Sequence, residues 1–193
     1  TPTADPTPTA TPEVTPTPGE TPTPTPGPIV DLIAIDVDPT GNTATSLGAV
    51  DTCVAVSPGS SFTIDIVVDA IPPYNPVSGG GLLAFQYDFN YGSLHVEAAD
   101  HLQLIAANGV DPIDFTEALP DNDGTLVAAF ADLGINEPES GAGILTRLTL
   151  QAGPADTVEL TLGNLGLVDS MSTLHPVSTV GSARVEVGGS CGP

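Results

Sequence analysis

Apolar and polar residues alternate with a period of two along most of the chain after residue 28. In the segment 62–69, every second residue is large and apolar: Phe62, Ile64, Ile66 and Val68. This alternation is typical of a β-strand that buries one face. The same pattern predicts further strands over residues 82–89, 93–97, 125–131, 144–151, 157–162, 165–168 and 184–187.

Turn residues separate these segments, for example Gly79, Gly80 and Gly81, or the run Asp121-Asn-Asp-Gly124. Only residues 101–108 and 112–119 have a composition that suits a short helical turn. About nine short strands separated by Gly and Pro turns predict an all-β fold, an antiparallel sandwich or jelly roll. We expect residues 29–193 to form this one domain.

The segment 29–38 is a further strand, divided from the next one at Cys53 by a loop of about 15 residues. It is either the first strand of its own domain or a strand that pairs with the sheet edge of a neighbouring copy. The second role would build a filament. The candidate contact residues of this segment are Ile29, Leu32, Ile33 and Ile35.

Residues 1–28 hold ten Thr and ten Pro, a composition that cannot form a packed core. Proline fixes its own φ and favours extended geometry in the residue before it. We expect a semi-rigid polyproline stalk of roughly 85 Å at about 3.1 Å per residue. Thr beside Pro is also typical of O-glycosylated stalks. The candidate acceptors are Thr7, Thr9, Thr15, Thr17, Thr21, Thr23 and Thr25.

The charge balance is strongly acidic, with 24 acidic residues against two basic ones and a formal net charge of -22. Nucleic acid and anionic membrane surfaces would repel such a chain. High salt, divalent cations or a cationic partner are compatible with it. Lysine is absent, which excludes Lys–Asn isopeptide bonds. No apolar run approaches the length of a membrane helix, and the Thr start indicates a mature product or a fragment.

Two cysteines, Cys53 and Cys191, lie almost a whole domain apart. No Cys-x-x-Cys motif occurs, so redox catalysis and zinc binding have no local support. One structural disulfide formed in an oxidising compartment is the favoured interpretation. Two unpaired, buried thiols are the alternative.

Two acidic turns resemble fragments of calcium loops, because closely spaced carboxylates beside a Gly suit a hard cation. The first contains Asp36, Asp38 and Asn42, and the second contains Asp121 and Asp123. Neither has the spacing of a complete EF-hand. Turns stabilised by Asp and Asn side chains are the alternative explanation.

Catalytic motifs are not apparent. His95, His101 and His175 share no spacing, and no nucleophile elbow or phosphate-binding loop occurs. We therefore expect no enzyme activity. Carbohydrate binding is a rival function, but sugar platforms usually need exposed aromatics, and Trp is absent. Tyr74 and Tyr91 fall in loop-like stretches, whereas Tyr87 is expected in the core.

The order of four segments resembles the cohesin domain, the scaffoldin module that docks dockerins. Residues 54–68 are similar to the family's opening strand, Pro/Gly turn and alternating strand, and residues 83–96 are similar to its F-x-Y-D hairpin. Residues 141–152 match its G-x-G strand, and residues 180–187 match its closing strand. Together the resemblance covers about residues 50 to 188.

This resemblance implies a nine-stranded jelly roll whose first and last strands run side by side, which would bring Cys53 and Cys191 together. It also implies a non-catalytic module. Leu82 and Ala84 fall where dockerin-binding cohesins place polar contacts, so the chain departs from the family there, and no dockerin-contact residue carries over. They remain candidate contact residues of the hairpin strand.

Taken together, these features predict a secreted module that associates with other proteins at the cell surface or in an extracellular assembly. One version docks a different protein, and the other assembles with copies of itself. A carbohydrate-binding module is the alternative function. The only cofactor that the sequence suggests is Ca²⁺.

Overall fold

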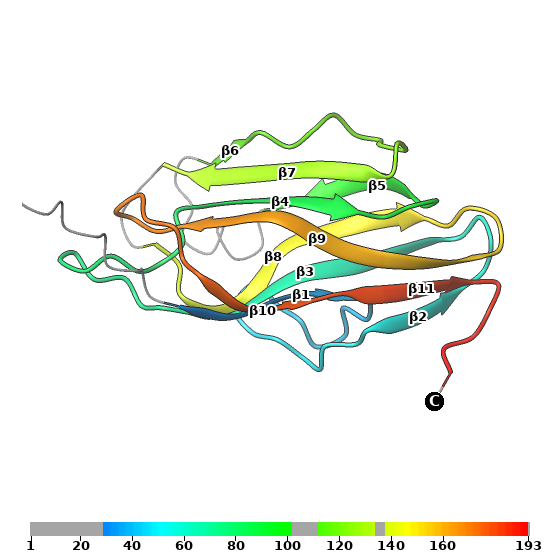
Figure 1. Cartoon of the computed structure of the whole chain (residues 1–193), viewed down its shortest axis with the longest axis horizontal. Coiled ribbons are helices and arrows are strands. Elements are labelled where there is room, and N and C mark those ends of the chain that lie inside the picture. The colour runs from blue at the N-terminus through cyan, green and yellow to red at the C-terminus, as the bar shows by residue number, and fades with distance from the viewer. Residues whose placement is uncertain (1–28, 102–111, 134–137, 193) are drawn as a thin grey trace, which may run out of the picture.

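The computed structural model describes residues 29–101, 112–133 and 138–192, which form eleven strands and no helix. The strands build two stacked sheets (Figure 1). One sheet has the order β10-β1-β3-β8-β5, and the other has the order β2-β11-β9-β4-β7-β6. The bounds are β1 Val30–Asp36, β2 Cys53–Val56, β3 Ser61–Ile71, β4 Ala84–Asn90, β5 His95–Asp100, β6 Pro112–Asp114, β7 Thr125–Asp132, β8 Gly141–Gln151, β9 Asp156–Val168, β10 Val177–Gly181 and β11 Ala183–Val187.

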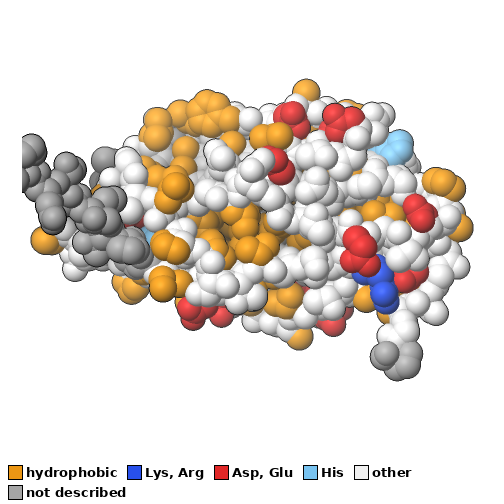
Figure 2. All heavy atoms as spheres, in the orientation of Figure 1, with side chains coloured by type: hydrophobic (Ala, Val, Ile, Leu, Met, Phe, Trp, Pro, Cys, Tyr) orange, Lys and Arg blue, Asp and Glu red, His pale blue; other side chains and the backbone are white. Residues whose placement is uncertain are grey.

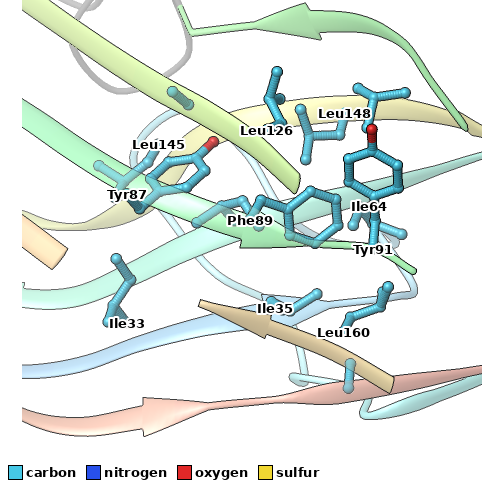
Figure 3. Packing of buried hydrophobic residues seen from close by; sticks show 14 of the residues in the cluster. Ile33, Ile35, Ile64, Tyr87, Phe89, Tyr91, Leu126, Leu145, Leu148 and Leu160 are labelled. Carbon is cyan, nitrogen blue, oxygen red and sulfur yellow. The ribbon is translucent and has the colours of Figure 1, made fainter. Parts of the chain in front are cut away.

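The alternation seen in the sequence places one face of most strands in a shared core. In β4, Phe85, Tyr87 and Phe89 point inward and are at most 3% exposed. Ile33 and Ile35 of β1 meet them from the other sheet (Figure 3). Full burial of a large aliphatic side chain contributes about 1.5–3 kcal/mol, so aliphatic and aromatic packing between the sheets is the main source of stability.

The all-β class is confirmed, but the nine-stranded antiparallel description is not. Each sheet contains a parallel pair, β1 with β10 and β2 with β11. Alternation along a strand identifies its buried face and does not identify the direction of its partner. Within the described residues, the two strands beyond the expected nine are β6 and β10. Their short segments lack a clear alternating pattern.

Both ends of the domain cross from one sheet to the other. Near the N-terminus, β1 lies in the first sheet and β2 in the second; near the C-terminus, β10 and β11 do the same, separated by Ser182 alone. The terminal segments therefore run beside each other in both sheets. This arrangement is why each sheet acquires a parallel pair.

The segment 29–38 forms a strand of its own domain. β1 pairs with β3 from Leu32 to Asp36, and on its other side with β10 from Val30 to Ala34. In this structure it is therefore an interior strand of its own sheet, and not a strand that pairs with the sheet edge of a neighbouring copy. The expected break between residues 162 and 165 is also absent, because β9 continues through it with a register shift opposite β4.

The remaining expectations concern the two possible helical turns and the stalk. The segment 112–119, expected as a helical turn, begins with the strand β6. Most of the segment 101–108, and the stalk with its seven candidate Thr acceptors, lie outside the described residues.

Candidate functional site

The outer face of the six-stranded sheet carries an apolar groove over β4, β7 and β9. Strand alternation turns the small residues Ala84, Ala129 and Ala131 outward, opposite the buried Phe85 and Phe130. The groove has a volume of about 430 Å³. Its described lining consists of Ala84, Phe85, Gln86, Phe115, Ala129, Phe130, Ala131, Leu165, Gly166, Val168 and Leu174. Figure 2 shows this face, with hydrophobic side chains gathered over the region of β4 and β9.

Part of the groove lining carries little side-chain bulk, because four of its positions are Ala84, Ala129, Ala131 and Gly166. Gly166 lies on β9 beside the register shift, where an added Cβ would come within 3.1 Å of Gln86 Cγ. Larger side chains stand at the sides: Phe115 is 65% exposed and Leu174 is 62% exposed. A ligand with its own apolar projections can therefore approach the sheet backbone closely.

Polar contacts near the groove involve acidic side chains. Asp88 on β4 accepts a short hydrogen bond from the Asn164 side chain of β9. Glu117 accepts a hydrogen bond of 2.7 Å from the backbone N–H of Val127 on β7. Among the described groove-lining side chains, Gln86 is the polar one. The surface is thus an apolar floor with carboxylates on neighbouring positions.

Both basic residues of the chain are engaged with acidic ones elsewhere. Arg147 forms two hydrogen bonds with Asp65, of 2.7 and 2.8 Å, and Arg184 lies 3.0 Å from Glu186. Neither arginine is therefore available to offset the acidic surface around the groove. The formal net charge of the whole chain is -22.

The predicted contact residues have different positions. Ala84 lines the groove, but Leu82 is fully buried, and its backbone N–H bonds to the carbonyl of Glu139. The resemblance did not show this, because it did not indicate where the strand starts: β4 begins at Ala84, so Leu82 lies in the preceding loop.

The candidate contact residues of the segment 29–38 also differ in exposure. Ile33 and Ile35 are fully buried in the core, Leu32 is half-buried, and Ile29 is 56% exposed. A partner cannot reach Ile33 or Ile35 in the folded domain, because both point between the sheets.

The first acidic turn is a hydrogen-bonded network. Asp36 is fully buried, and its carboxylate accepts from the backbone N–H groups of Asp38 and Asp51 and from the Asn42 amide. The same amide nitrogen lies 3.1 Å from Asp65, which also binds Arg147. These contacts use the carboxylate oxygens that a cation would need.

Asp38 and the second acidic turn likewise form local hydrogen bonds. The Thr40 hydroxyl and backbone N–H both donate to Asp38, which lowers the pKa of its carboxyl. Asp121 accepts from the Tyr91 hydroxyl at 2.8 Å, and Asp123 accepts from the backbone N–H of Thr125. Within the described ranges, no three His, Cys, Asp or Glu side chains are grouped to hold a metal ion.

The three histidines have separate environments. His95 is exposed on β5, whereas His175 is buried and its Nε2 lies 2.8 Å from the Gly81 carbonyl. His101 is 2% exposed and hydrogen bonds through both ring nitrogens, with Thr146 at 2.8 Å and Thr116 at 2.7 Å. Burial lowers the pKa of His101, against the opposing effect of Asp114 and Asp100.

Of the aromatics considered for sugar binding, Tyr91 is fully buried and Tyr87 is 1% exposed, as expected for Tyr87. Tyr74 is 42% exposed. Phe115, beside the groove, was not recognised from the sequence, because it lies in a segment without clear periodicity. The Phe115 N–H donates to the Ala129 carbonyl, which continues the pairing of β6 with β7 past Asp114.

A disulfide joins Cys53 at the start of β2 to Cys191 after β11. The prediction of one structural disulfide is confirmed. It is consistent with the parallel pairing of β2 and β11, which places the two chain segments together. The described residues contain no helix that is long and apolar enough to span a membrane.

Comparison with known proteins gives structural relatives only. No protein-family model matches the chain, and no curated protein matches its sequence. The fold is similar to a non-cellulosomal cohesin from the archaeon Archaeoglobus fulgidus, with 14% identity, 81% of this chain and 91% of that chain covered, and a TM-score of 0.54.

Two clostridial structures show the same relationship. The CaCohA2 structure from Clostridium acetobutylicum has 17% identity, covers 86% of this chain and 94% of that one, and gives a TM-score of 0.55. The Coh-OlpC–Doc435 complex from Clostridium thermocellum, a type I cohesin–dockerin complex, has 14% identity, coverage of 86% and 99%, and a TM-score of 0.55. The two-sheet architecture of this chain is therefore a cohesin-like fold.

Proposed function

We propose that this domain is a non-catalytic, extracellular docking module that binds a partner protein in the groove over β4, β7 and β9. The apolar groove is the observation on which the proposal rests. An exposed apolar depression on an otherwise acidic surface is unfavourable in water unless something covers it. A folded partner could place a projecting segment in the groove and contact the sheet face around it.

Two further findings support the proposal. Two structures of similar fold are complexes of a cohesin with a dockerin, so this architecture supports protein docking in other chains. The disulfide suits an oxidising compartment, which supports a location outside the cytoplasm.

The surface chemistry defines the partner. It should present aliphatic side chains to the Ala and Gly floor, and Lys or Arg to the carboxylates Asp88 and Glu117 beside it. Rim charges of this kind act chiefly on association rate and specificity. Binding should therefore weaken with rising salt, while the apolar contact persists.

Substitution of the groove floor provides the test. We would measure binding of the full chain to a panel of dockerin modules by titration calorimetry, with Ala129→Arg and Ala55→Arg variants. Both alanines lie on the six-stranded sheet, but Ala55 is exposed on β2, away from the groove. Ala129→Arg should weaken binding at least about tenfold, because it fills the floor with a charged side chain. Ala55→Arg should leave binding within about twofold.

Equal losses in the two variants would refute the groove as the docking surface. If no panel member binds, a dockerin-type partner is excluded. Sedimentation of the chain alone then tests the self-assembling version: association that Ala129→Arg abolishes would assign the groove to a second copy.

Carbohydrate binding is supported only by the exposed rings of Tyr74 and Phe115, which are 42% and 65% exposed. A glycan array separates the two functions, since sugar recognition would require stacking on these rings. Binding that Phe115→Ala removes and Ala129→Arg retains would favour the sugar-binding alternative.

A further inference from the structure

The disulfide leaves the N-terminal strand β1 outside a covalently closed loop that contains the whole docking surface. Cys53 and Cys191 are 138 residues apart in sequence, and β4, β7 and β9 all lie between them. We propose that the domain bears tension between its two chain ends, and that the disulfide directs this load past the strands of the groove. This inference does not depend on which partner the groove binds.

The load enters at β1. This strand begins at the left end of the molecule in Figure 1, while the C-terminus lies at the lower right, so a pull on the two ends acts along the long dimension. β1 is held on both sides, by β3 from Leu32 to Asp36 and by β10 from Val30 to Ala34. Ladder hydrogen bonds run across the strands, so a pull along β1 strains many of them together.

The far end of β1 is anchored by buried polar contacts. Asp36 ends the strand and accepts hydrogen bonds from Asp51 and Asn42, at 3.0 and 2.8 Å. The Asn42 amide also reaches Asp65 of β3, and Asp65 binds Arg147 of β8. The loop between β1 and β2 is thereby attached to the interior of the sheet. Withdrawal of β1 must break this network.

The load leaves through the disulfide. From β1 the covalent path follows the loop to Cys53, crosses to Cys191 and continues to the C-terminus. The strands of the groove are not part of this path. Without the bond, the path would run through all of them, from β2 to β11. The disulfide therefore limits how far the domain can lengthen.

The expected lengths follow from the covalent path. Between Ile29 and Cys53 the chain has about 24 residue steps, so complete release of this segment adds at most about 85 Å at about 3.5 Å per residue. With the disulfide reduced, about 163 residue steps separate residues 29 and 192, or about 570 Å.

The experiment holds the full chain by its two termini under constant force, with and without a thiol reductant. The oxidised chain should gain no more than about 85 Å in one step. In the reduced chain, the distance between residues 29 and 192 should approach the fully extended length of about 570 Å. At the same force, the time before the first lengthening step should also be longer for the oxidised chain than for the reduced chain. Equal total lengths in the two states would overturn the proposal, as would an equal or shorter lifetime of the oxidised chain.

A matched pair of variants tests the anchor in the oxidised chain. Asn42→Ala removes the amide that joins Asp36 and Asp65, whereas Asn122→Ala alters an exposed side chain inside the disulfide loop. Asn42→Ala should shorten the lifetime before the first step at least about fivefold without changing the step length. Asn122→Ala should change it less than about twofold. An unchanged lifetime for Asn42→Ala would show that β1 does not bear the load.

Discussion

Asp65 departs from its place in the strand pattern. The alternation of β3 assigns it to the outward face with Thr63, yet its exposure is 0%, because the loop between β1 and β2 covers that face near Asn42. A carboxylate can be buried only when its charge and lone pairs are satisfied. Arg147 and Asn42 provide both.

Removal of the cation tests this interpretation. Arg147→Met should lower the free energy of unfolding by about 2–3 kcal/mol, because Asp65 loses its charged partner. We expect less than for a fully buried pair, since the Arg147 side chain is 34% exposed. Urea denaturation gives the difference. In contrast, Arg184→Met should cost less than about 1 kcal/mol, as its side chain is 40% exposed. Similar losses in both variants would contradict the burial argument.

His101 should make stability depend on pH. Burial lowers its pKa below the ordinary value of about 6.5, so the unfolded chain binds a proton more readily than the folded one. Its contribution to stability is complete above about pH 6.5 and is lost as the pH falls toward the lower folded-state pKa.

The measurement is urea denaturation between pH 7.5 and 5. Wild type should lose more stability over this range than His101→Gln, in which residue 101 has no imidazole. His95→Gln provides the control, because His95 is exposed, and it should follow the wild-type dependence. Parallel curves for wild type and His101→Gln would contradict the assignment.

At the scale of elements, β1 shows why a strand pattern does not reveal a strand's place in the sheet. The sequence predicts the strand. The same alternation would suit a strand of its own domain and a strand that pairs with a neighbouring copy. The structure places it between β3 and β10, with Ile33 and Ile35 in the core.

Truncation distinguishes the interior strand from a detachable one. Deletion of residues 1–28 should leave the melting temperature unchanged, because the described core begins at Val30. Deletion of residues 1–38 should unfold the domain, since it removes Ile33 and Ile35 and leaves β3 and β10 without their shared partner. Circular dichroism and NMR spectra would report this. A folded 1–38 deletion would show that β1 is dispensable.

The groove could be predicted only in part. The resemblance indicated Ala84 on the hairpin strand, and it lies in the groove lining. Leu82, two residues earlier, is in the core instead, because β4 begins at Ala84. Ala129, Leu174 and Phe115 come from other parts of the chain, and their meeting depends on the pairing of β4 with β7 and β9.

At the scale of the whole molecule, the disulfide closes a loop that contains most of the domain. Cross-linking over 138 residues restricts the unfolded chain and should contribute about 4–5 kcal/mol in the chain-entropy treatment. Urea denaturation with and without reductant measures this contribution. The Cys53→Ala/Cys191→Ala double variant should match the reduced wild type. A loss below about 1 kcal/mol would show that the unfolded chain is already restricted.

The sequence by itself determined the strand content, the acidic surface and the presence of two cysteines able to pair, because each follows from residue type and local periodicity. The tertiary structure decided which strands are neighbours, in which direction they run and which carboxylates are buried. Those properties depend on contacts between residues distant in the chain. Local alternation records only that a residue faces inward or outward, so the parallel pairs, the enclosed Asp65 and the groove required the assembled sheets.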